Sequence, residues 1–395
     1  MQRKTRAING KRAADKVEAL GKRVNFVVGA SVLLWGCGGV AGPSPGSGPL
    51  VMGAEVAGAA PASEALTAVW RRQVGRALVF APTVAGSAIV VATGVGEVHA
   101  LDAATGSRHW RRRIGEGEVG GVAVAGDRIY VAEAMPHGRV VALSIQDGRK
   151  LWDRRVGEVR HAPTITGDAV LVATADGTVK QLDAATGGVV WEAGVTGVAS
   201  VPPLLHGESV VIATTADTLY RLNRVDGAIV GRTGLPGRVS AAPLLVGELL
   251  LLPMYSGAVI GHHLEHDAQR WIVSLDAPIL AAPLPHGEES AYVLTRAGTV
   301  WRVGVETGSA ERIAEAGGAA TRSFARAGSS FLIGTLDGSL LLLDGDGGVA
   351  WRERFGDSIV APAVAYGGAV YVPLLRGGVV KLVTRPEAGE ERARW

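Results

Sequence analysis

The chain has 395 residues, of which 56 are glycine and only 19% are Lys, Arg, Asp or Glu. This composition suits short strands joined by turns and argues against a helical solenoid. The pI of about 9.1 reflects residues 1–23, which hold eight of the 40 basic and two of the 37 acidic side chains. The remaining 32 basic and 35 acidic residues make a near-neutral body, which argues against a nucleic-acid partner.

Residues 24–36 form a 13-residue, mostly apolar run after the basic start. The run is too short to span a bilayer as a helix and has the length of a signal-peptide core. It ends at Cys37, the only cysteine, and Leu34-Trp35-Gly36-Cys37 resembles a bacterial lipobox. The resemblance implies a lipoprotein-type signal peptide over 1–36. It also implies a lipidated Cys37. Residues 38–68 are rich in Gly, Ala, Pro and Ser with almost no charge, which predicts a flexible linker. The alternative is a plain signal peptide with an unmodified cysteine.

The next stretch of the chain repeats a hairpin that ends in tryptophan. Ala100–Trp110 returns almost unchanged at Gln181–Trp191 and more loosely at Ala142–Trp152. In its turn, Asp bonds its own backbone and Gly supplies a positive φ. One hairpin cannot bury the Trp ring alone, so the copies are expected to stack.

The Trp position recurs every 38–42 residues. The eight positions are Trp70, Trp110, Trp152, Trp191, Gly231, Trp271, Ile313 and Trp351. We expect the six Trp residues to dock between neighbouring repeats. The two repeats without Trp are expected to be locally the weakest, with faster amide exchange.

Each repeat contains four short segments rich in Val, Ile, Leu and Thr, which is typical of a propeller blade. The inner strands are expected to begin near Ala81, Val122, Ala162, Pro202, Ala242, Ala282, Phe324 and Ala361. The array starts with an outer strand, Val69–Val74, and ends with three strands, the last at Val379–Val383. The two ends complete one blade. We therefore predict an all-β, single closed eight-bladed β-propeller over 69–384, closed by the N-terminal strand, with a charged tail at 385–395.

These repeats, of the form Ala-x-Asp-x-x-Thr-Gly-x-x-x-Trp, resemble those of the quinoprotein-type eight-bladed propellers. That group includes pyrroloquinoline-quinone dehydrogenases with calcium, which are larger. It also includes the BamB type, a lipoprotein scaffold of the outer-membrane protein assembly machine. Every blade here is too short for the insertions of the enzymes. BamB-type proteins bind through loops that correspond to Thr196–Ser200 and Gly237–Ser240, although neither stretch repeats their contact pattern.

The loops that lead into the inner strands carry alternating charge, and such loops gather at one face of a propeller. We take Glu116, Glu118, Arg160, His161 and Arg238 as candidate partner-binding residues. Single acids, Asp176, Asp217 and Asp337, occur at repeat-equivalent turns, where turn chemistry alone would place them.

A second candidate is the stretch that holds His262, His263 and His266. Its composition would suit zinc or nickel, but it falls on an outer hairpin turn. There we expect polar, solvated side chains and no metal site.

The interpretation we favour is a non-catalytic scaffold without a cofactor. The resemblance implies a lipid anchor in the outer membrane facing the periplasm, a protein partner such as the outer-membrane assembly pore, and a monomeric propeller. The alternatives are an envelope ligand-binding or sensor propeller and a quinone-dependent dehydrogenase.

Overall fold

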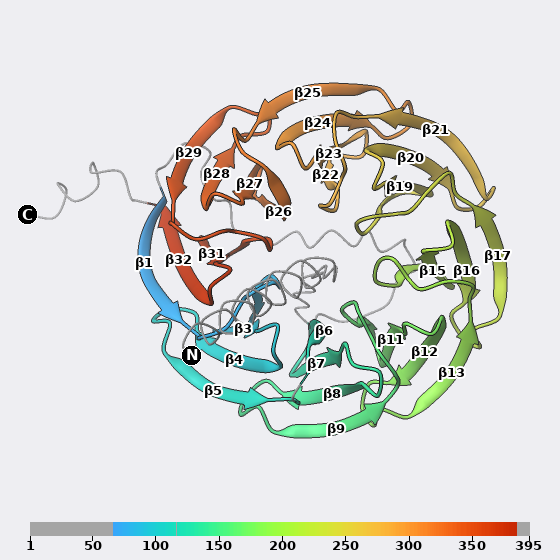
Figure 1. The fold of residues 1–395 in the computed structure, drawn as a ribbon, viewed down its shortest axis with the longest axis horizontal. Coiled ribbons are helices and arrows are strands. Elements are labelled where there is room, and N and C mark those ends of the chain that lie inside the picture. Colours follow the sequence, from blue (N-terminus) through green and yellow to red (C-terminus); the bar gives the residue numbers. More distant parts are fainter. Residues whose placement is uncertain (1–65, 116, 385–395) are drawn as a thin grey trace, which may run out of the picture. The chain divides into compact units, whose positions relative to one another are not determined.

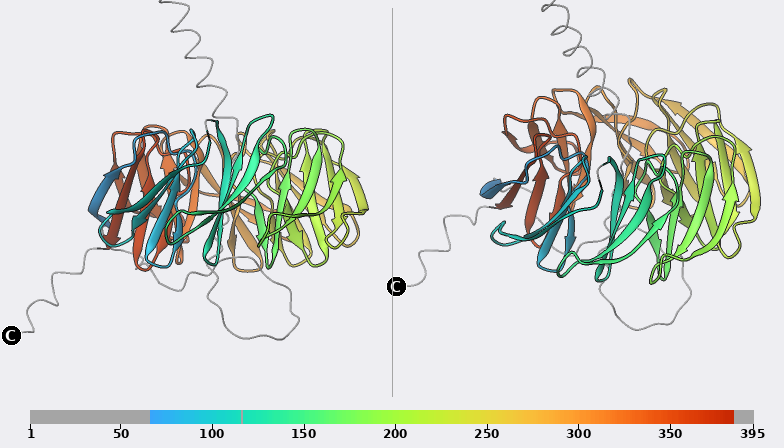
Figure 2. Two further views of the ribbon diagram at one scale, coloured as in Figure 1. Left: turned by 90° about the horizontal axis from the view of Figure 1, so that it is seen from below. Right: turned by 60° about the horizontal axis from the view of Figure 1, so that its bottom comes forward.

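In a computed structural model of the chain, residues 66–115 and 117–384 are described. Every regular element in these ranges is a β-strand. The strands form eight antiparallel sheets of four, arranged as blades around a ring (Figure 1). Seen from the side, the strands cross the thickness of the ring and the turns lie on its two faces (Figure 2). The prediction of a closed eight-bladed propeller is confirmed, and no described helix could span a membrane.

Blades 1 to 8 are numbered by their inner strands. The inner strands are β2 (Thr83–Ala85), β6 (Val119–Ala125), β10 (Thr164–Thr166), β14 (Leu204–His206), β18 (Leu244–Val246), β22 (Leu284–His286), β26 (Ala320–Ala327) and β30 (Val364–Tyr366). The second strands are β3 (Ala88–Ala92), β7 (Arg128–Glu133), β11 (Ala169–Ala173), β15 (Ser209–Thr214), β19 (Leu249–Pro253), β23 (Ser290–Leu294), β27 (Ser330–Thr335) and β31 (Ala369–Pro373).

The two outer positions of each blade follow the same order. The third strands are β4 (Glu97–Asp102), β8 (Arg139–Ser144), β12 (Thr178–Asp183), β16 (Thr218–Asn223), β20 (Ala258–His263), β24 (Thr299–Gly304), β28 (Ser339–Leu343) and β32 (Gly378–Thr384). The outer strands are β5 (Arg108–Arg113), β9 (Lys150–Arg155), β13 (Val189–Gly194), β17 (Ile229–Gly234), β21 (Ala268–Ser274), β25 (Ala310–Glu315), β29 (Val349–Arg354) and β1 (Leu66–Gln73).

The inner strands differ from the expected starts in a systematic way. In the six blades with an Ala-Pro or Pro-Pro segment, the strand begins two or three residues later than predicted, because proline has no N–H to donate to the ladder. Blades 2 and 7 have no proline there. Their inner strands begin earlier than predicted, at Val119 and Ala320, and are seven and eight residues long.

The ring closes as predicted. Strand β1 pairs antiparallel with β32, with Trp70 opposite Lys381, and it thereby becomes the outer strand of blade 8 (Figure 1). The strand begins at Leu66, three residues before the expected start. Closure gives the sheet of blade 8 its fourth strand and removes an open edge at which the array could pair with another chain.

The joints between blades are built on a ring and a glycine. The Trp of one blade lies against the positive-φ glycine in the outer hairpin turn of the next. A Cβ added to Gly148 would lie 2.6 Å from the Trp110 ring, and one added to Gly187 would lie 2.5 Å from the Trp152 ring. The equivalent pairs are Trp70 with Gly106, Trp191 with Gly227 and Trp271 with Gly308. Only a residue without a side chain leaves room for the indole.

Four of these five docked indoles also have a polar partner. Trp110 donates Nε1–H to the Ile145 carbonyl at 2.8 Å, and Trp152 donates to the Ala184 carbonyl at 3.0 Å. The Trp191 and Trp271 indoles bond the corresponding carbonyls of Arg224 and Val305. In three joints, an arginine two residues after the Trp donates Nε–H to the carbonyl of the turn glycine. The N–H groups of these four indoles are thus satisfied, as their burial requires.

The two joints without Trp use other side chains for the same carbonyl. At Gly231, the Arg221 guanidinium occupies the space beside the missing ring and donates to the Leu264 carbonyl. At Ile313, the Tyr292 hydroxyl donates to the Gly345 carbonyl at 2.5 Å. The hydrogen bond is therefore retained where the ring is absent. The expected faster amide exchange in these blades stays a prediction.

The joint at the ring closure is different again. Tyr371 donates its hydroxyl to the Ala103 carbonyl at 3.2 Å, which is the acceptor that Trp70 would use by analogy with the other joints. Among the described residues, the buried Trp70 Nε1 has no hydrogen-bond partner. Trp351, in blade 7, packs on an apolar cluster shared by blades 7 and 8. In blade 8, closure by β1 replaces the outer hairpin turn.

We expect Gly187→Ala to destabilise the protein more than Gly167→Ala. Both glycines have positive φ, +71° and +53°, so both variants carry similar backbone strain. Only the first new methyl group would meet an indole, because nothing lies within 4 Å at Gly167. The free energy of unfolding in urea should fall by about 1–3 kcal/mol more for Gly187→Ala. An equal loss of free energy of unfolding in the two variants would show that the Trp152 indole does not need a glycine beneath it.

Two tyrosine variants separate the closure joint from the others. Tyr292→Phe leaves the Gly345 carbonyl and the His286 Nδ1 atom, 2.8 Å from the hydroxyl, without this partner, and should cost about 1–3 kcal/mol. Tyr371→Phe frees the Ala103 carbonyl for Trp70 and should cost less than about 1 kcal/mol. Urea unfolding of both variants measures the difference, and a larger loss for Tyr371→Phe would contradict this assignment of acceptors.

Candidate functional site

The connectors between blades are clamped in the same way all around the ring. Each connector runs from the outer strand of one blade to the inner strand of the next. One carbonyl in it accepts a hydrogen bond from an amide in the turn between the second and third strands of the blade that it enters. The donor and acceptor pairs are Gly94 to Ala77, Ala134 to Glu118, Ala175 to Glu158, Thr215 to Val198, Tyr255 to Arg238, Arg296 to Pro278, Leu336 to Ala319 and Leu375 to Ser358.

We call the connectors and these turns the connector face. Its backbone is uniform, with clamp distances of 2.7–3.0 Å, while the side chains differ from blade to blade. A rigid frame with variable loops is where binding residues usually lie. The connector face is therefore the candidate site.

Blade 5 presents the largest side chains at the clamp positions. The Arg238 guanidinium lies 5.4 Å from the centre of the Tyr255 ring, and Tyr255 is 50% exposed. Arg296 is exposed at the same position of blade 6. Arginine stacked on an exposed tyrosine is a common core of protein interfaces. The sequence indicated Arg238 but not Tyr255, because a tyrosine after a strand gives no sign that it will be left exposed.

Blades 2 and 3 carry acidic groups at the clamp positions. Glu118 is exposed, and Glu158 forms an ion pair with Arg160, with 2.6 Å between Oε1 and Nε. Arg160 is also exposed, but this pairing offsets its charge. Glu116, the remaining acidic candidate, lies outside the described residues. At the clamp positions, the connector face thus carries Glu118 at blade 2, an ion pair at blade 3, and the arginines Arg238 and Arg296 at blades 5 and 6.

His161 does not face solvent. It is only 6% exposed, and its Nε2 lies 2.9 Å from the Ala199 carbonyl of the next connector. The expectation of an exposed, partner-binding histidine is therefore corrected: its position one residue after Arg160 turns its ring into the joint between connectors.

Arg322 lies on β26 and is half-buried. Burial lowers its pKa to about 10, so this side chain is still cationic at neutral pH.

The turn acids bond their own turns. Asp176 accepts hydrogen bonds from the Thr174 hydroxyl and the Thr178 amide, and Asp337 accepts the same pair of bonds from Thr335 and Ser339. The hydroxyl bonds hold the pKa values of both carboxyl groups below their usual range. Asp217, the third acid, takes a positive φ of 50° at its turn. These are the contacts that turn chemistry predicts.

The three-histidine stretch is only partly a solvated turn. His262 lies on β20 and is 1% exposed, with Nε2 3.3 Å from the Asp267 carboxylate. The expectation of solvent exposure is wrong for this residue, because it lies on the strand rather than in the turn. Burial lowers its pKa, which keeps the imidazole neutral. Across residues 66–115 and 117–384, no three His, Cys, Asp or Glu side chains lie together as a metal site would need.

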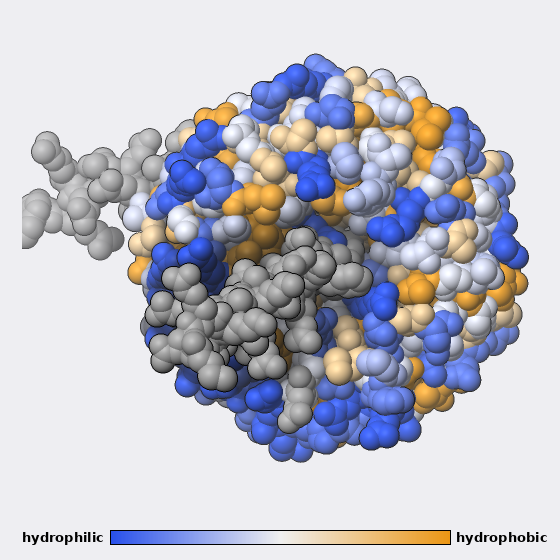
Figure 3. Space-filling model, viewed as in Figure 1, coloured by the Kyte–Doolittle hydropathy of each residue, from blue (hydrophilic) through white to orange (hydrophobic). Residues whose placement is uncertain are grey.

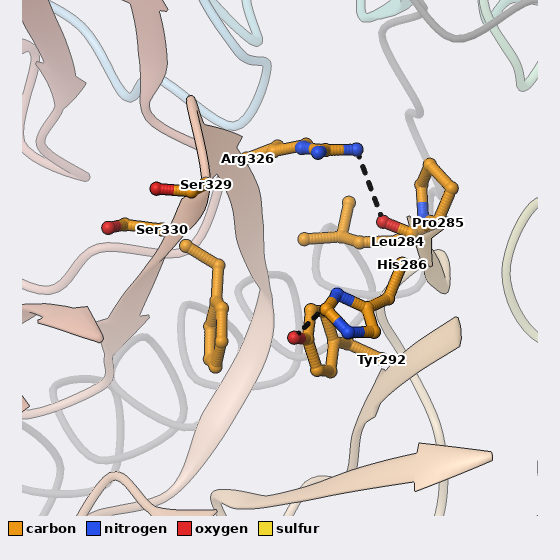
Figure 4. A pocket seen from close by; sticks show the side chains of 8 residues that line it. Leu284, Pro285, His286, Tyr292, Arg326, Ser329 and Ser330 are labelled. Atoms are coloured by element: carbon orange, nitrogen blue, oxygen red, sulfur yellow. Dashed lines mark hydrogen bonds between the residues drawn. The ribbon is translucent and has the colours of Figure 1, made fainter. Parts of the chain in front are cut away.

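A small hollow lies between β22 and β26 (Figure 4). Its walls include Pro285, His286, Tyr292 and Arg326, and the Tyr292 hydroxyl bonds His286 Nδ1 there. The volume of about 10 Å³ is close to the space of one water molecule and far below that of a pocket for a small organic ligand. The hollow therefore lies beside the joint that Tyr292 forms, and it is too small to hold a cofactor.

The outside of the ring mixes polar and apolar side chains. Figure 3 shows mostly hydrophilic residues with scattered hydrophobic ones on the face in view. In addition to Tyr255, the connector face exposes three apolar side chains in blades 1, 2 and 7: Val95, Met135 and Leu336. All three lie in or next to the turns that clamp the connectors.

A family model described as the outer membrane protein assembly factor BamB matches residues 56–195 and 175–266, which together exceed half of the chain. The chain belongs to the BamB family. No curated protein sequence matches it.

Among solved structures, this BamB-family chain resembles BamB from Moraxella catarrhalis, with 20% identity, a TM-score of 0.67 and coverage of 81% of this chain and 98% of that one. It also resembles the computationally designed protein Ika8, with 15% identity, a TM-score of 0.69 and coverage of 82% and 100%.

A third similar structure is an enzyme, the quinohemoprotein alcohol dehydrogenase ADHIIG from Pseudomonas putida HK5. It shares 12% identity and a TM-score of 0.63, with coverage of 81% of this chain and 76% of the enzyme. At these identities the three structures establish the fold alone. The assignment to the BamB family rests on the match of the family model.

Proposed function

We propose that this BamB-family propeller is a non-catalytic scaffold of the bacterial envelope that binds a protein partner through the connector face. The partner that the family suggests is the periplasmic part of the outer-membrane assembly pore. The propeller binds it as a monomer and without a cofactor.

The observation that carries the proposal is the exposed Arg238–Tyr255 pair. Tyr and Arg are the side chains that most often dominate the energy of protein interfaces, and here both are held on a clamped, rigid backbone. A rigid frame reduces the entropy lost when the partner binds. Glu118 at blade 2 and the arginines at blades 5 and 6 would orient a partner of complementary charge.

The sequence supports the location. The lipobox-like stretch before Cys37 fits a lipid-anchored protein that faces the periplasm. Residues 38–65 would then join the acylated cysteine to β1.

The binding test uses the full chain and the purified periplasmic domains of the assembly pore from the same bacterium. The variant combines Arg238→Glu with Tyr255→Ala. We expect its Kd to rise at least tenfold, because the change removes the aromatic contact and reverses the charge beside it.

A matched control lies in the same blade. Arg270→Glu with Ile272→Ala makes the same charge change on the outer strand β21 and removes an apolar side chain that is also 50% exposed. This control should bind the partner as the wild type does. Equal loss in both variants, or no loss in the first, would contradict binding at the connector face.

The anchor has its own test. Cys37→Ser should abolish incorporation of radiolabelled palmitate and move the protein out of the membrane fraction. Labelling that persists in the Cys37→Ser variant would contradict lipidation at this residue.

A further inference from the structure

The fold gathers basic residues that are far apart in the sequence. Strands β1, β5 and β9 are the outer strands of blades 8, 1 and 2, which follow one another around the ring (Figure 1). Together they carry nine Arg or Lys and one acidic residue. The nine are Arg71, Arg72, Arg108, Arg111, Arg112, Arg113, Lys150, Arg154 and Arg155, and all are exposed. We call this surface the basic arc.

The rest of the outer wall is different. Strands β13, β17, β21, β25 and β29 carry five basic and four acidic residues. The sequence from 66 to 384 holds 29 basic and 30 acidic residues, so the body is close to neutral. The positive charge of the arc is thus a local feature of three blades, and such a local excess attracts anions.

The contacts of these side chains neutralise only a small part of the charge. Arg111 pairs with Glu97, and Lys150 pairs with Asp153. Arg72, Arg112 and Arg154 bond a neutral backbone carbonyl through Nε alone, which leaves their charge uncompensated. No described acidic group forms an ion pair with Arg71, Arg108 or Arg155.

The chemistry of the arc fits a diffuse anionic surface better than a protein partner. Its exposed groups are long, flexible and nearly all of one kind, and its three indoles are docked into the joints. An interface for a folded protein would need an exposed aromatic or apolar centre. The connector face has one, whereas the three strands of the arc expose a single large apolar side chain, Val69. Arginines spread over a broad surface suit the phosphates of lipid headgroups.

The position of β1 favours the same occupant. Only 28 residues separate Cys37 from Leu66, the first residue of β1 and of the arc. If these residues form a coil, as the sequence predicts, their mean span is about 30 Å. An acyl group on Cys37 would hold the arc near the bilayer, and this step rests on the anchor proposed above.

We infer that the basic arc binds the anionic headgroups of the membrane in which Cys37 is anchored. The ring then stands with its outer wall on the bilayer, and the connector face is turned to the side. In this orientation the face is open to the periplasmic domains of a protein embedded in the same membrane.

The test is vesicle flotation of the full chain with phosphatidylcholine vesicles that contain 0 or 30% phosphatidylglycerol, at low and high salt. The arc variant is Arg71→Glu with Arg108→Glu and Arg155→Glu. The control, Arg238→Glu with Arg270→Glu and Arg296→Glu, has the same net charge. Binding is expressed as the ratio of the partition coefficients on anionic and neutral vesicles, which cancels any contribution of the anchor.

We expect the arc variant to lower this ratio at least tenfold at low salt, and the control to keep most of it. High salt should reduce the ratio of the wild type. An equal ratio in the two variants would overturn the inference, as would a wild type without preference for anionic vesicles. The result is independent of the partner-binding test, which contains no vesicles, so either proposal can fail without the other.

Discussion

The closed propeller depends on tryptophan indoles that each need a glycine beneath them. In five of the eight joints, the Trp of one blade occupies the space that a side chain would fill at the turn glycine of the next. The same turn supplies the carbonyl that the indole N–H bonds in four of them. One short turn thus serves packing and hydrogen bonding together. Because the turn recurs in blades 1 to 7, each of these blades can receive a side chain from the blade before it, and the array closes when β1 completes blade 8.

Where the indole is missing, the joint keeps the hydrogen bond to the turn carbonyl. Arg221 and Tyr292 reach the carbonyls that Trp would bond, and the blade after Gly231 has Asp267 instead of glycine at the socket, with a positive φ of 50°. A turn that receives no indole does not need a glycine. The loss of Trp at position 231 and the replacement of the turn glycine by Asp267 therefore belong together. This regular frame fixes the backbone of both faces and of the outer wall. Function can then vary through side chains alone, as at Tyr255 and along the basic arc.

The sequence predicted the architecture well because period, turn chemistry and complementary ends are local signals. It placed the inner strands two to four residues away from their true starts, since proline decides which part of the Ala-Pro segment can pair. It could not show that His161 and His262 are buried, because burial depends on the neighbouring blade or on strand register. The basic arc was also missed. Four of its nine residues already lie together within residues 108–113. The other two groups lie about 40 residues before and after them, and only the propeller brings Arg71, Arg108 and Arg155 onto neighbouring strands.

The central claim is that indole and glycine form one unit across each joint. A double-mutant cycle on Trp191 and Gly227 tests it most directly, because the two variants share a single contact. In the wild type, Gly227→Ala would put a methyl group 2.5 Å from the Trp191 ring. The claim predicts that Gly227→Ala costs about 1–3 kcal/mol less in the Trp191→Ala background than in the wild type. A cost that is the same in both backgrounds would mean that the two residues act independently, and would contradict the claim.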